Sequence, residues 1–374
     1  MSQIQKLTVK GYKSIRALEN FELRPLNVLI GANGAGKSNF ISLFKFLHEM
    51  YEQQLQFYVQ KQGGVDAFLH FGREVSSGME LAFWFPVESL PHVQQGYRVS
   101  LLASADNRLL FESEECRFFG SGEMPVMNPD YSLGQGHAEA RLKDAQDQRS
   151  NHVRPAVSNW RVYHFHDTSE TAKVKRVHGV NDNLRLKPDA ANLAAYLRKL
   201  KTTQHYEDSY RRIVETIRRA APFFGDFVFR EEDTEYVQLE WTERSRPDTP
   251  WKAHILSDGT LRFMCLATLL LQPQKMLPDT ILIDEPELGL HPFAISLLAE
   301  MLKEAAESKQ VIVSTQSVEL LNHFQPEDVV VVQREGDASV FKRLDTEELA
   351  DWLADNYSLG ELWQRNILGG RPTR

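Results

Sequence analysis

The stretch LNVLIGANGAGKSNF, residues 26–40, joins an apolar run, a glycine-rich loop and the start of a helical pattern. Residues 31–38 match the phosphate-loop pattern G-x-x-x-x-G-K-S in full. Downstream of the loop, apolar residues recur at Phe40, Phe44 and Leu47, which is the spacing of one helix face. A strand before the glycine loop and a helix after it are the context that this motif requires. The stretch therefore predicts an α/β fold with a nucleotide site at the end of a strand.

Each part of this Walker A loop has an expected task. Gly34 and Gly36 let backbone N–H groups face the phosphates, and the helix start adds the positive end of its dipole. Lys37 is expected to neutralise the β- and γ-phosphates of ATP, and Ser38 to bind Mg²⁺. The residues predicted to contact the nucleotide here are Gly31, Asn33, Gly34, Ala35, Gly36, Lys37, Ser38 and Asn39. The alternative, a glycine-rich turn with an incidental lysine, leaves the flanking strand and helix unexplained.

A second apolar run, TILID at residues 280–284, predicts a strand that delivers two adjacent carboxylates at its end. Sheets of α/β proteins place their ligands at this end of the strands. Asp284 is expected to hold Mg²⁺ through water, and Glu285 to polarise the water that attacks the γ-phosphate. The alternative is a pair of solvated acids that follow a strand. Together with the P-loop, this Walker B pattern predicts an ATPase.

The segment LSDGT, residues 256–260, opens a long helix predicted over 258–271. Ser257 is a good N-cap, Gly259 allows a close backbone approach, and the helix start attracts anions. One chain then has two phosphate-binding helix starts, although one triphosphate needs a single P-loop. We expect the second start, with Ser257, Asp258 and Gly259, to serve the nucleotide of another copy. ATP would then hold together a homodimer or a higher homo-oligomer; the alternative is a plain helix cap.

The remaining patterns predict one parallel and one antiparallel sheet. Unbroken β-branched runs that alternate with helices are typical of a parallel sheet covered on both faces, and they lie at residues 280–284, 310–314 and 328–332, with a helix at 292–307. Short strands joined by loops too short for parallel crossovers predict an antiparallel side sheet at 79–85, 97–102 and 108–111. Further strands are predicted at 4–9, 159–166 and 237–241, and helices from 190 and around 210–217. Residues 120–158, rich in Gly, Pro, Asn and Asp, are predicted to be an insertion or a mobile loop.

The composition excludes several classes of protein. With 42% hydrophobic and 25% charged residues, the chain has the make-up of a soluble globular protein rather than a disordered or fibrous one. The longest apolar run, residues 261–271, is far shorter than the roughly 20 residues of a membrane span, and the N-terminus has no apolar signal-peptide core. The two cysteines, Cys116 and Cys265, are far apart and suggest neither a disulfide framework nor a zinc site. We expect a cytoplasmic protein with no membrane partner.

A cationic face is predicted on the helices of the middle segment. It comprises Arg198, Lys199, Lys201, Arg211, Arg212, Arg218 and Arg219. Three interpretations stay open: a DNA-binding ridge, a partner-docking face, or a solvated surface, which is what charge runs usually are. The formal net charge of −8 opposes extensive phosphate binding, so DNA is expected as a partner only through a local contact.

The motifs together resemble those of a known family. GANGAGKSN, LSDGTLRF, ILIDEPELGLHP and STQS stand in the order and approximate spacing of the ABC-type ATPase heads of the SMC/RecF class. The chain most closely resembles the stand-alone bacterial AAA family ATPases of the AAA_21 group, and NLAAYLRKL, RRIVETIRRAAPFFGDF and SLGELWQRNILGGRP extend the likeness nearly end to end. The resemblance implies an ABC-ATPase-like P-loop fold with a mainly parallel core sheet, an antiparallel β side sheet and an α-rich insertion. We expect an N-terminal lobe at 1–118, the insertion at 119–235, a C-terminal lobe at 236–344 and a tail at 345–374.

The resemblance also implies roles for residues outside the two Walker motifs. In such families the serine and glycine of LSDGT form the signature loop and contact the γ-phosphate held by the other protomer. Leu288, Gly289 and His291 resemble the D-loop, which crosses the dimer interface. Lys13, in VKGYKSI, resembles a basic residue that some of these heads place near the nucleotide phosphates.

Two features depart from the family pattern. Related proteins usually have His in the switch position after the strand 310–314, where this chain has Gln316 in STQS. Glutamine can donate a hydrogen bond to a γ-phosphate oxygen but cannot carry positive charge, so we expect Gln316 to take part in catalysis with slow turnover. No glutamine stands in clear register for a Q-loop before the side sheet, and Gln60 and Gln62 are weak candidates.

The resemblance implies ATP binding and hydrolysis in a nucleotide-gated dimer. Short heads of this kind work in bacterial DNA repair or as the sensing ATPase of anti-phage systems, beside a separately encoded nuclease or toxin. About sixty residues follow STQS, too few for the TOPRIM domain of related fused proteins, so we expect a separate effector. Two alternatives remain: the ATPase subunit of an ABC transporter, which shares every phosphate-binding element, and a P-loop kinase, which leaves LSDGT unexplained.

Overall fold

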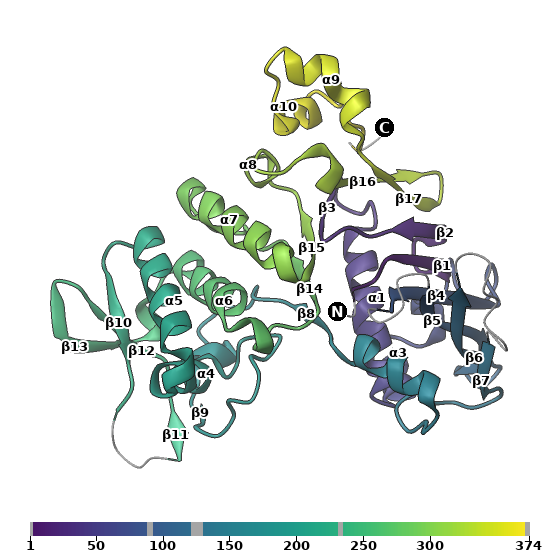
Figure 1. Cartoon of the computed structure of the whole chain (residues 1–374), viewed down its shortest axis with the longest axis horizontal. Coiled ribbons are helices and arrows are strands. Elements are labelled where there is room, and N and C mark those ends of the chain that lie inside the picture. The colour runs from purple at the N-terminus through teal and green to yellow at the C-terminus, as the bar shows by residue number, and fades with distance from the viewer. Residues whose placement is uncertain (1–2, 88–92, 121–129, 231–234, 371–374) are drawn as a thin grey trace.

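Two six-stranded sheets form the framework of the molecule (Figure 1). The computed structural model describes residues 3–87, 93–120, 130–230 and 235–370. Helix α1 (Lys37–Tyr51) lies between the two sheets, and α6 (Asp258–Leu271) and α7 (Pro292–Ser308) lie beyond the other face of the core sheet. The arrangement confirms the predicted α/β fold class.

The core sheet has the strand order β17-β16-β3-β15-β14-β8. Its strands are β3 (Leu26–Ile30), β8 (Trp160–Tyr163), β14 (Thr280–Asp284), β15 (Gln310–Thr315), β16 (Val329–Glu335) and β17 (Ala338–Arg343). All neighbours pair in parallel except β17, which runs antiparallel to β16. The mainly parallel core sheet is therefore as predicted. Its edge strand β8 comes from the segment 119–235, which the sequence suggested to be an insertion.

The central strands are apolar at successive positions because both of their faces are buried. Along β14, Leu282 packs into the hydrophobic cluster around α1 and the side sheet, whereas Ile281 and Ile283 pack into the cluster around α6 and α7. On the α1 side, Phe44 meets Trp160 edge to face, with ring centroids 5.7 Å apart. The core sheet thus separates two hydrophobic cores.

The side sheet is antiparallel throughout, with the order β2-β1-β4-β5-β6-β7. Its strands are β1 (Lys6–Tyr12), β2 (Ile15–Glu22), β4 (Gly78–Pro86), β5 (Val93–Ala103), β6 (Leu109–Gly120) and β7 (Asp130–Gly134). The three predicted side-sheet strands are confirmed as β4, β5 and β6, and β2 was missed. Its exposed outer positions hide the alternation that marks a strand.

The prediction of a loop over residues 120–158 is wrong for two parts of it. Residues 130–134 form β7, an exposed edge strand that pairs with β6, and α3 (Gln148–Ser158) follows. Asp147 caps α3, since its side chain accepts hydrogen bonds from the backbone N–H groups of Arg149 and Ser150. Neither element has a clear apolar period, and Pro155 lies inside the helix, so neither could be predicted from the sequence pattern. Residues 121–129 lie outside the described residues.

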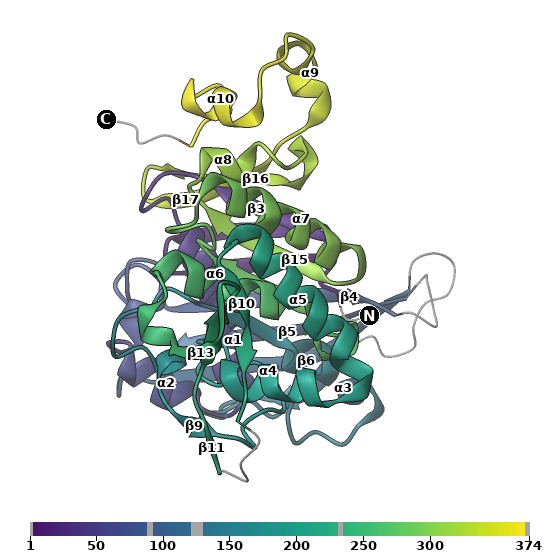
Figure 2. The ribbon, with the colours of Figure 1, turned by 90° about the vertical axis from the view of Figure 1, so that its left-hand side faces the viewer.

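Beyond α6 and α7, the described residues include two helices and two small sheets (Figure 2). The helices are α4 (Leu193–Thr202) and α5 (Glu207–Ala220), as predicted. The three-stranded sheet contains β10 (Phe224–Val228), β12 (Glu240–Glu243) and β13 (Arg246–Lys252). The two-stranded sheet pairs β9 (His178–Gly179) with β11 (Tyr236–Val237). The single strand predicted at 237–241 is therefore divided between two sheets.

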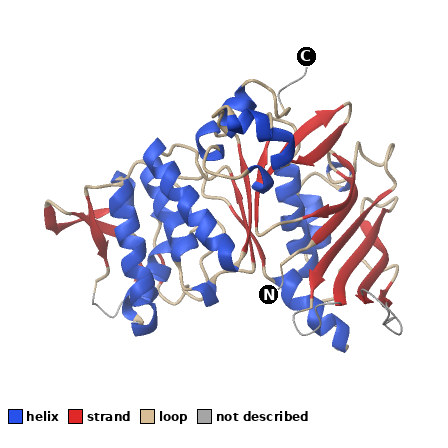
Figure 3. Ribbon diagram, turned by 45° about the horizontal axis from the view of Figure 1, so that its top comes forward, coloured by secondary structure: helices blue, strands red, loops and turns tan. Residues whose placement is uncertain are grey.

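Short helices complete the chain (Figure 3). They are α2 (Leu55–Lys61), α8 (Val318–Leu321), α9 (Thr346–Ala354) and α10 (Leu359–Gln364), with 3₁₀ turns η1 (Val65–Ala67), η2 (Lys173–Lys175), η3 (Gln204–Tyr206), η4 (Ala253–Ile255), η5 (Gln274–Met276) and η6 (Pro326–Asp328). Helices α9 and α10 lie within the segment 345–374. Among the described residues, the helices are all too short or too polar to cross a membrane.

Candidate nucleotide-binding site

Four parallel strands bring chemically important segments to one edge of the core sheet. Strand β3 leads into the Walker A loop, β14 into Glu285, β15 into Gln316 and β8 into His164. Because all four strands run in the same direction, their carboxyl ends meet at the same edge, which is where α/β sheets bind ligands. The first three segments were predicted to belong to the site. The fourth was not.

The Walker A loop forms an open helix start. Helix α1 begins at Lys37 with Gly36 at its N-cap in the left-handed region (φ 118°), and no side chain caps its first amides. A Cβ added at Gly36 would lie 2.1 Å from Ser339 Oγ, whereas one at Gly34 (φ 78°) would meet nothing within 4 Å. Uncapped amides, with no acidic residue in the first turn, are an anion-binding arrangement. The geometry therefore fits the predicted phosphate contact.

Lys37 is buried inside this loop. Its Nζ donates hydrogen bonds to the carbonyl oxygens of Gly31 (2.7 Å) and Ala32 (3.1 Å). Burial lowers the pKa of Lys37, and the nearby carboxylates of Asp284 and Glu285 act in the opposite direction. The ammonium thus lies between the loop backbone and the acids of β14, where it can neutralise bound phosphate.

The other predicted loop residues divide into exposed and packed positions. Asn33 and Ser38 are exposed, which suits groups that contact a ligand. Ala35 is buried, and its carbonyl oxygen accepts a hydrogen bond of 2.5 Å from the Ser339 hydroxyl. Asn39 donates from Nδ2 to Ser14 Oγ (2.7 Å) and so ties α1 to the β1–β2 turn. Asn39 and Ala35 therefore have contacts that hold the loop in place.

Lys13 lies against α1. Its Nζ donates to Ser42 Oγ (2.9 Å) and lies 5.5 Å from the ring centroids of both Tyr12 and Phe68. Burial lowers its pKa. The backbone of Lys13 is left-handed (φ 47°), so a tight turn presents the side chain to the helix that follows the Walker A loop. Its predicted contact with the nucleotide remains a prediction.

Asp284 and Glu285 occupy the end of β14 in different ways. Oδ1 of Asp284 is buried and has no hydrogen-bond partner among the described residues, so the carboxylate is available to a cation. Glu285 has a left-handed backbone (φ 43°), and its N–H donates to the Ser314 carbonyl on β15 (2.8 Å). A strained non-glycine backbone persists only where neighbours enforce it, and such residues cluster at functional sites.

The switch residue Gln316 contacts the Walker B segment directly. Its side-chain Nε2 donates to Glu285 Oε1, and its backbone N–H donates to Glu287 Oε1 (3.2 Å). Glu287 also accepts from the Thr315 hydroxyl (2.6 Å), and burial raises its pKa. Gln316 and Glu285 are therefore brought together as the predicted catalytic pair, and Glu287 is an acidic residue of the site that sequence reasoning did not single out.

The LSDGT segment lies beside the predicted D-loop. Ser257 caps α6, because its Oγ accepts from the backbone N–H of Thr260 (3.2 Å), and Ser257 and Asp258 are exposed. A Cβ at Gly259 would lie 2.2 Å from the Gly289 carbonyl oxygen, so this close approach requires glycine. The two segments share a cavity of about 130 Å³ that is lined by Ala220, Ala221, Ser257, Gly259, Thr260, Phe263, Gly289, Leu290, His291 and Ala294.

Arg262 ties the D-loop to α6 and to the end of β8. This nearly buried side chain donates to the carbonyl oxygens of Phe165 (2.9 Å), His166 (3.2 Å) and Leu288. Sequence reasoning missed its role. The signal was a single arginine inside the apolar run of α6, since a cation that breaks such a run must find partners when the helix is buried.

The two Q-loop candidates belong to α2 and its C-cap rather than to a strand of the core sheet. Gln60 and Gln62 lie exposed at the end of α2, and the strand next to β14 is β8. The residues that follow β8 place His164 and His166 next to Asp284. Burial lowers the pKa of His164, and Asp284 opposes that shift. Two histidines therefore lie beside Asp284, the residue predicted to hold Mg²⁺.

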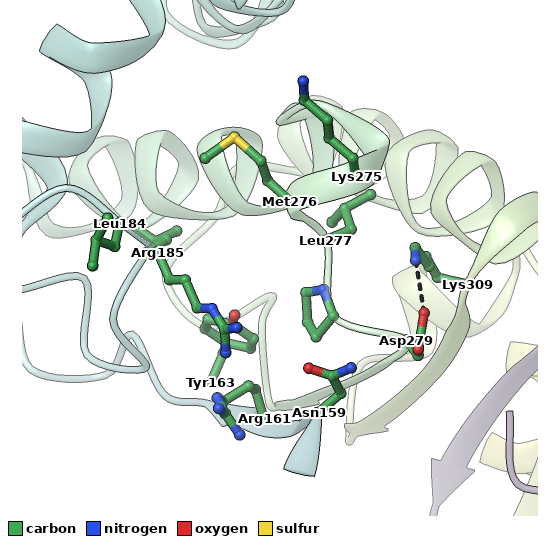
Figure 4. Close-up of a pocket in the computed structure, with 12 residues that line it drawn as sticks. Asn159, Arg161, Tyr163, Leu184, Arg185, Lys275, Met276, Leu277, Asp279 and Lys309 are labelled. Atoms are coloured by element: carbon green, nitrogen blue, oxygen red, sulfur yellow. Dashed lines mark hydrogen bonds and ion pairs between the residues drawn. The ribbon is translucent and has the colours of Figure 1, made fainter. Parts of the chain in front are cut away.

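A cavity of about 330 Å³ lies at the opposite end of the same strands (Figure 4). It opens beside Asn159 before β8 and Lys309 before β15, where Lys309 pairs with Asp279 (2.8 Å). Arg185 points into it, close to Tyr163. Because parallel strands begin here and end at the Walker A loop, this cavity is no part of the nucleotide site.

The predicted cationic face carries many acidic partners. Helix α5 packs on α7, where Arg212 contacts Glu304 and Arg219 lies 3.5 Å from Glu300. Arg211 pairs with the acids at the start of its own helix. The face is therefore of mixed charge, which favours a solvated surface over a DNA-binding ridge.

Comparisons with known proteins show the family of the chain. A family model described as "AAA domain, putative AbiEii toxin, Type IV TA system" (AAA_21) matches residues 26–122 and 130–322. A curated protein named "Putative ABC transporter ATP-binding protein", from Methanosarcina acetivorans, is 34% identical over 79 residues. That match covers 21% of this chain and 27% of the relative, so the chain spans about a quarter of the relative's length.

Two solved structures are similar over nearly the whole chain. One is the SmcHead bound to the C-winged helix domain of ScpA, with a TM-score of 0.59 and 16% identity over 93% of this chain and 99% of that chain. The other is the Smc head domain with an extended coiled coil bound to the C-terminal domain of ScpA derived from Pyrococcus furiosus. Its TM-score is 0.58, with 14% identity over 95% of this chain and 100% of that chain. At such identities the likeness shows the fold alone.

Proposed function

Since the chain belongs to the AAA_21 family of AAA-domain ATPases, we propose that it binds ATP with Mg²⁺, closes as a homodimer around the nucleotide and hydrolyses it. In this proposal the Walker A loop of one copy and the LSDGT helix start of the other hold the same triphosphate. Hydrolysis removes the γ-phosphate that both copies contact, and the dimer opens.

One observation carries the proposal. The exposed start of α6 lies beside the D-loop, and the cavity that they share is lined by no residue of the Walker A loop. Helices α1 and α6 lie beyond opposite faces of the core sheet (Figure 1). These observations support separate places in one chain for the phosphate held at Lys37 and for the start of α6 at Ser257. A second copy supplies the missing contact.

The chain's own residues fit the nucleotide and the cation. The uncapped N–H groups at the start of α1 donate to phosphate oxygens, and Lys37 neutralises their charge. Ser38, exposed at the same helix start, and the unpartnered Oδ1 of Asp284 are the oxygens that would hold Mg²⁺, which neutralises developing phosphate charge when it is bound. Glu285 accepts a proton from the attacking water, and Gln316 orients that carboxylate.

The biological role that we propose is regulatory. We propose a sensor ATPase in bacterial anti-phage defence or DNA repair that works with a separately encoded effector; the family description, which names a putative AbiEii toxin and a type IV toxin–antitoxin system, supports the defence setting. Both similar Smc head structures hold a domain of a second protein, ScpA. We therefore propose that this chain also binds a protein partner. We assign no DNA contact to the mixed-charge face of α5.

The alternative is an ABC transporter subunit, because the curated relative has that name. The two functions differ in where the ATPase is found. Co-purification with membranes that survives high salt but not detergent would favour the transporter. Recovery in the soluble fraction, with ATP-dependent dimerisation, favours the proposed function.

The deciding experiment measures mass in solution by light scattering, with and without ATP and Mg²⁺. We expect Glu285→Gln to accumulate as a dimer with ATP, because nucleotide binding survives while hydrolysis falls by roughly 10²–10⁴-fold. Lys37→Ala is the matched control and should stay monomeric with ATP. A Glu285→Gln protein that binds ATP but remains monomeric at micromolar concentration would sink the proposal.

A further inference from the structure

Three potential metal ligands converge at the end of β14. His164, His166 and Asp284 each offer a ligand atom, and these atoms lie within 4.8 Å of one another. The imidazole ring centroids are 6.2 Å apart, and Oδ1 of Asp284 is buried without a partner. In the part of the chain that the structure describes, neither imidazole makes a hydrogen bond through a ring nitrogen. The three side chains therefore lie close together but form no hydrogen bonds with one another.

The strand register explains why they meet. Strands β8 and β14 pair in parallel with Tyr163 opposite Ile283, so the next residues, His164 and Asp284, come level at the same edge. In an extended chain alternate side chains share a face, which puts His166 on the side of His164. Phe165 between them points the other way, into the core.

Backbone contacts hold this segment in place. The N–H of His164 donates to the Pro188 carbonyl (2.9 Å), and Arg262 donates to the carbonyl oxygens of Phe165 and His166. All three residues after β8 are therefore anchored through the backbone, while both imidazoles are left to face Asp284. A preorganised metal site needs residues whose backbone is fixed and whose side-chain ligand atoms are free to bind the ion.

We propose that His164, His166 and Asp284 form a binding site for a divalent transition metal. The proposal rests on the proposed function in one respect, since Asp284 is also the carboxylate assigned there to Mg²⁺. Ligand bonds of about 2.1 Å place the donor atoms of one ion roughly 3–4 Å apart, so small side-chain rotations close the site.

The chemistry of the donors sets the metal class. Imidazole suits Fe²⁺, Co²⁺ and Zn²⁺, whereas Mg²⁺ prefers an all-oxygen shell and gives up its water reluctantly. Two nitrogens and one carboxylate leave further positions open for water or phosphate oxygens. The site should therefore select these ions over Mg²⁺ and bind them without nucleotide.

The test titrates Co²⁺ into the nucleotide-free full-length protein and follows its visible absorption, with Mg²⁺ as competitor. We expect one Co²⁺ per chain, with a band stronger than that of Co²⁺ in buffer, and no displacement by Mg²⁺ at equal concentration. His164→Gln and His166→Gln should each weaken Co²⁺ binding by about tenfold or more. His205→Gln, which changes an exposed histidine on η3, should bind as the wild type does.

Binding of a fluorescent ATP analogue in EDTA shows that each variant is folded and keeps its Walker A loop. Wild-type Co²⁺ binding that equal Mg²⁺ reverses, or a band no stronger than that of the buffer, overturns the proposal without any variant. Folded histidine variants with wild-type Co²⁺ affinity also overturn it. If the wild type does not bind the ATP analogue even with Mg²⁺ present, the proposed function fails instead, whatever the result with Co²⁺.

Discussion

The side-chain amide of Gln316 donates a hydrogen bond to Oε1 of Glu285 and so connects the ends of β15 and β14. A glutamine in this position orients the carboxylate through a neutral donor. It therefore aligns the predicted base without adding charge, which accounts for the expectation of slow turnover.

Two substitutions of Gln316 distinguish the effect of its hydrogen bond on ATP turnover from the effect of a positive charge. Gln316→Leu should lower ATP turnover roughly a hundredfold, because a donor at the reacting groups is lost. Gln316→His should raise turnover above the wild type, and more at pH 6 than at pH 8, since the imidazolium is more populated at low pH. Phosphate release at saturating ATP measures both. A histidine variant no faster than the wild type at either pH would contradict the slow-turnover hypothesis.

Two serine caps allow the LSDGT contact to be tested against a matched control. Ser257→Ala and Ser358→Ala each remove an N-cap hydrogen bond, at the start of α6 and α10 respectively, and each should cost about 1 kcal/mol of stability. Only Ser257→Ala should weaken ATP-dependent dimerisation in the Glu285→Gln background, as measured by light scattering. Equal dimerisation of the two variants would show that Ser257 is only a cap.

Arg262 should be a stability determinant as well as a link between loops. Arg262→Met leaves three carbonyl acceptors without their donor, so the free energy of unfolding should fall by about 2–4 kcal/mol. Urea unfolding measures this. Arg219→Met is the control, because Arg219 is exposed and its pair with Glu300 is worth little. Similar losses for the two variants would contradict the assigned contacts.

His48 on α1 predicts a pH dependence of stability. Burial, with Arg161 close by, lowers its pKa from 6.5 to about 4. A depressed folded-state pKa means that stability is fully present above pH 6.5 and is lost as the pH falls from 6.5 towards 4. His48→Gln should flatten the decline of the melting temperature in this window, relative to the wild type. Parallel curves for the two proteins would show that other groups control acid unfolding.

The sequence predicts most residues of the candidate nucleotide site because the signals of that site are local. The Walker A loop needs a strand, a glycine loop and a helix within fifteen residues, and Ser257 marks a helix start by its own side chain. Asp284 and Glu285 stand at the end of an apolar run, and such a run is typical of a strand in a sheet that is covered on both faces. Their order along the chain was enough to predict the family and the fold class, and both are borne out.

What the sequence left open depends on which strands become neighbours. His164 and Asp284 are far apart in the chain, and only the pairing of β8 with β14 places them side by side. The partners of Arg262, and the acids of α7 that pair with the arginines of α5, likewise come from packing between distant segments. Sites formed by residues close together in the chain can therefore be predicted from the sequence. Contacts across the sheet depend on strand order and register, which no short motif encodes.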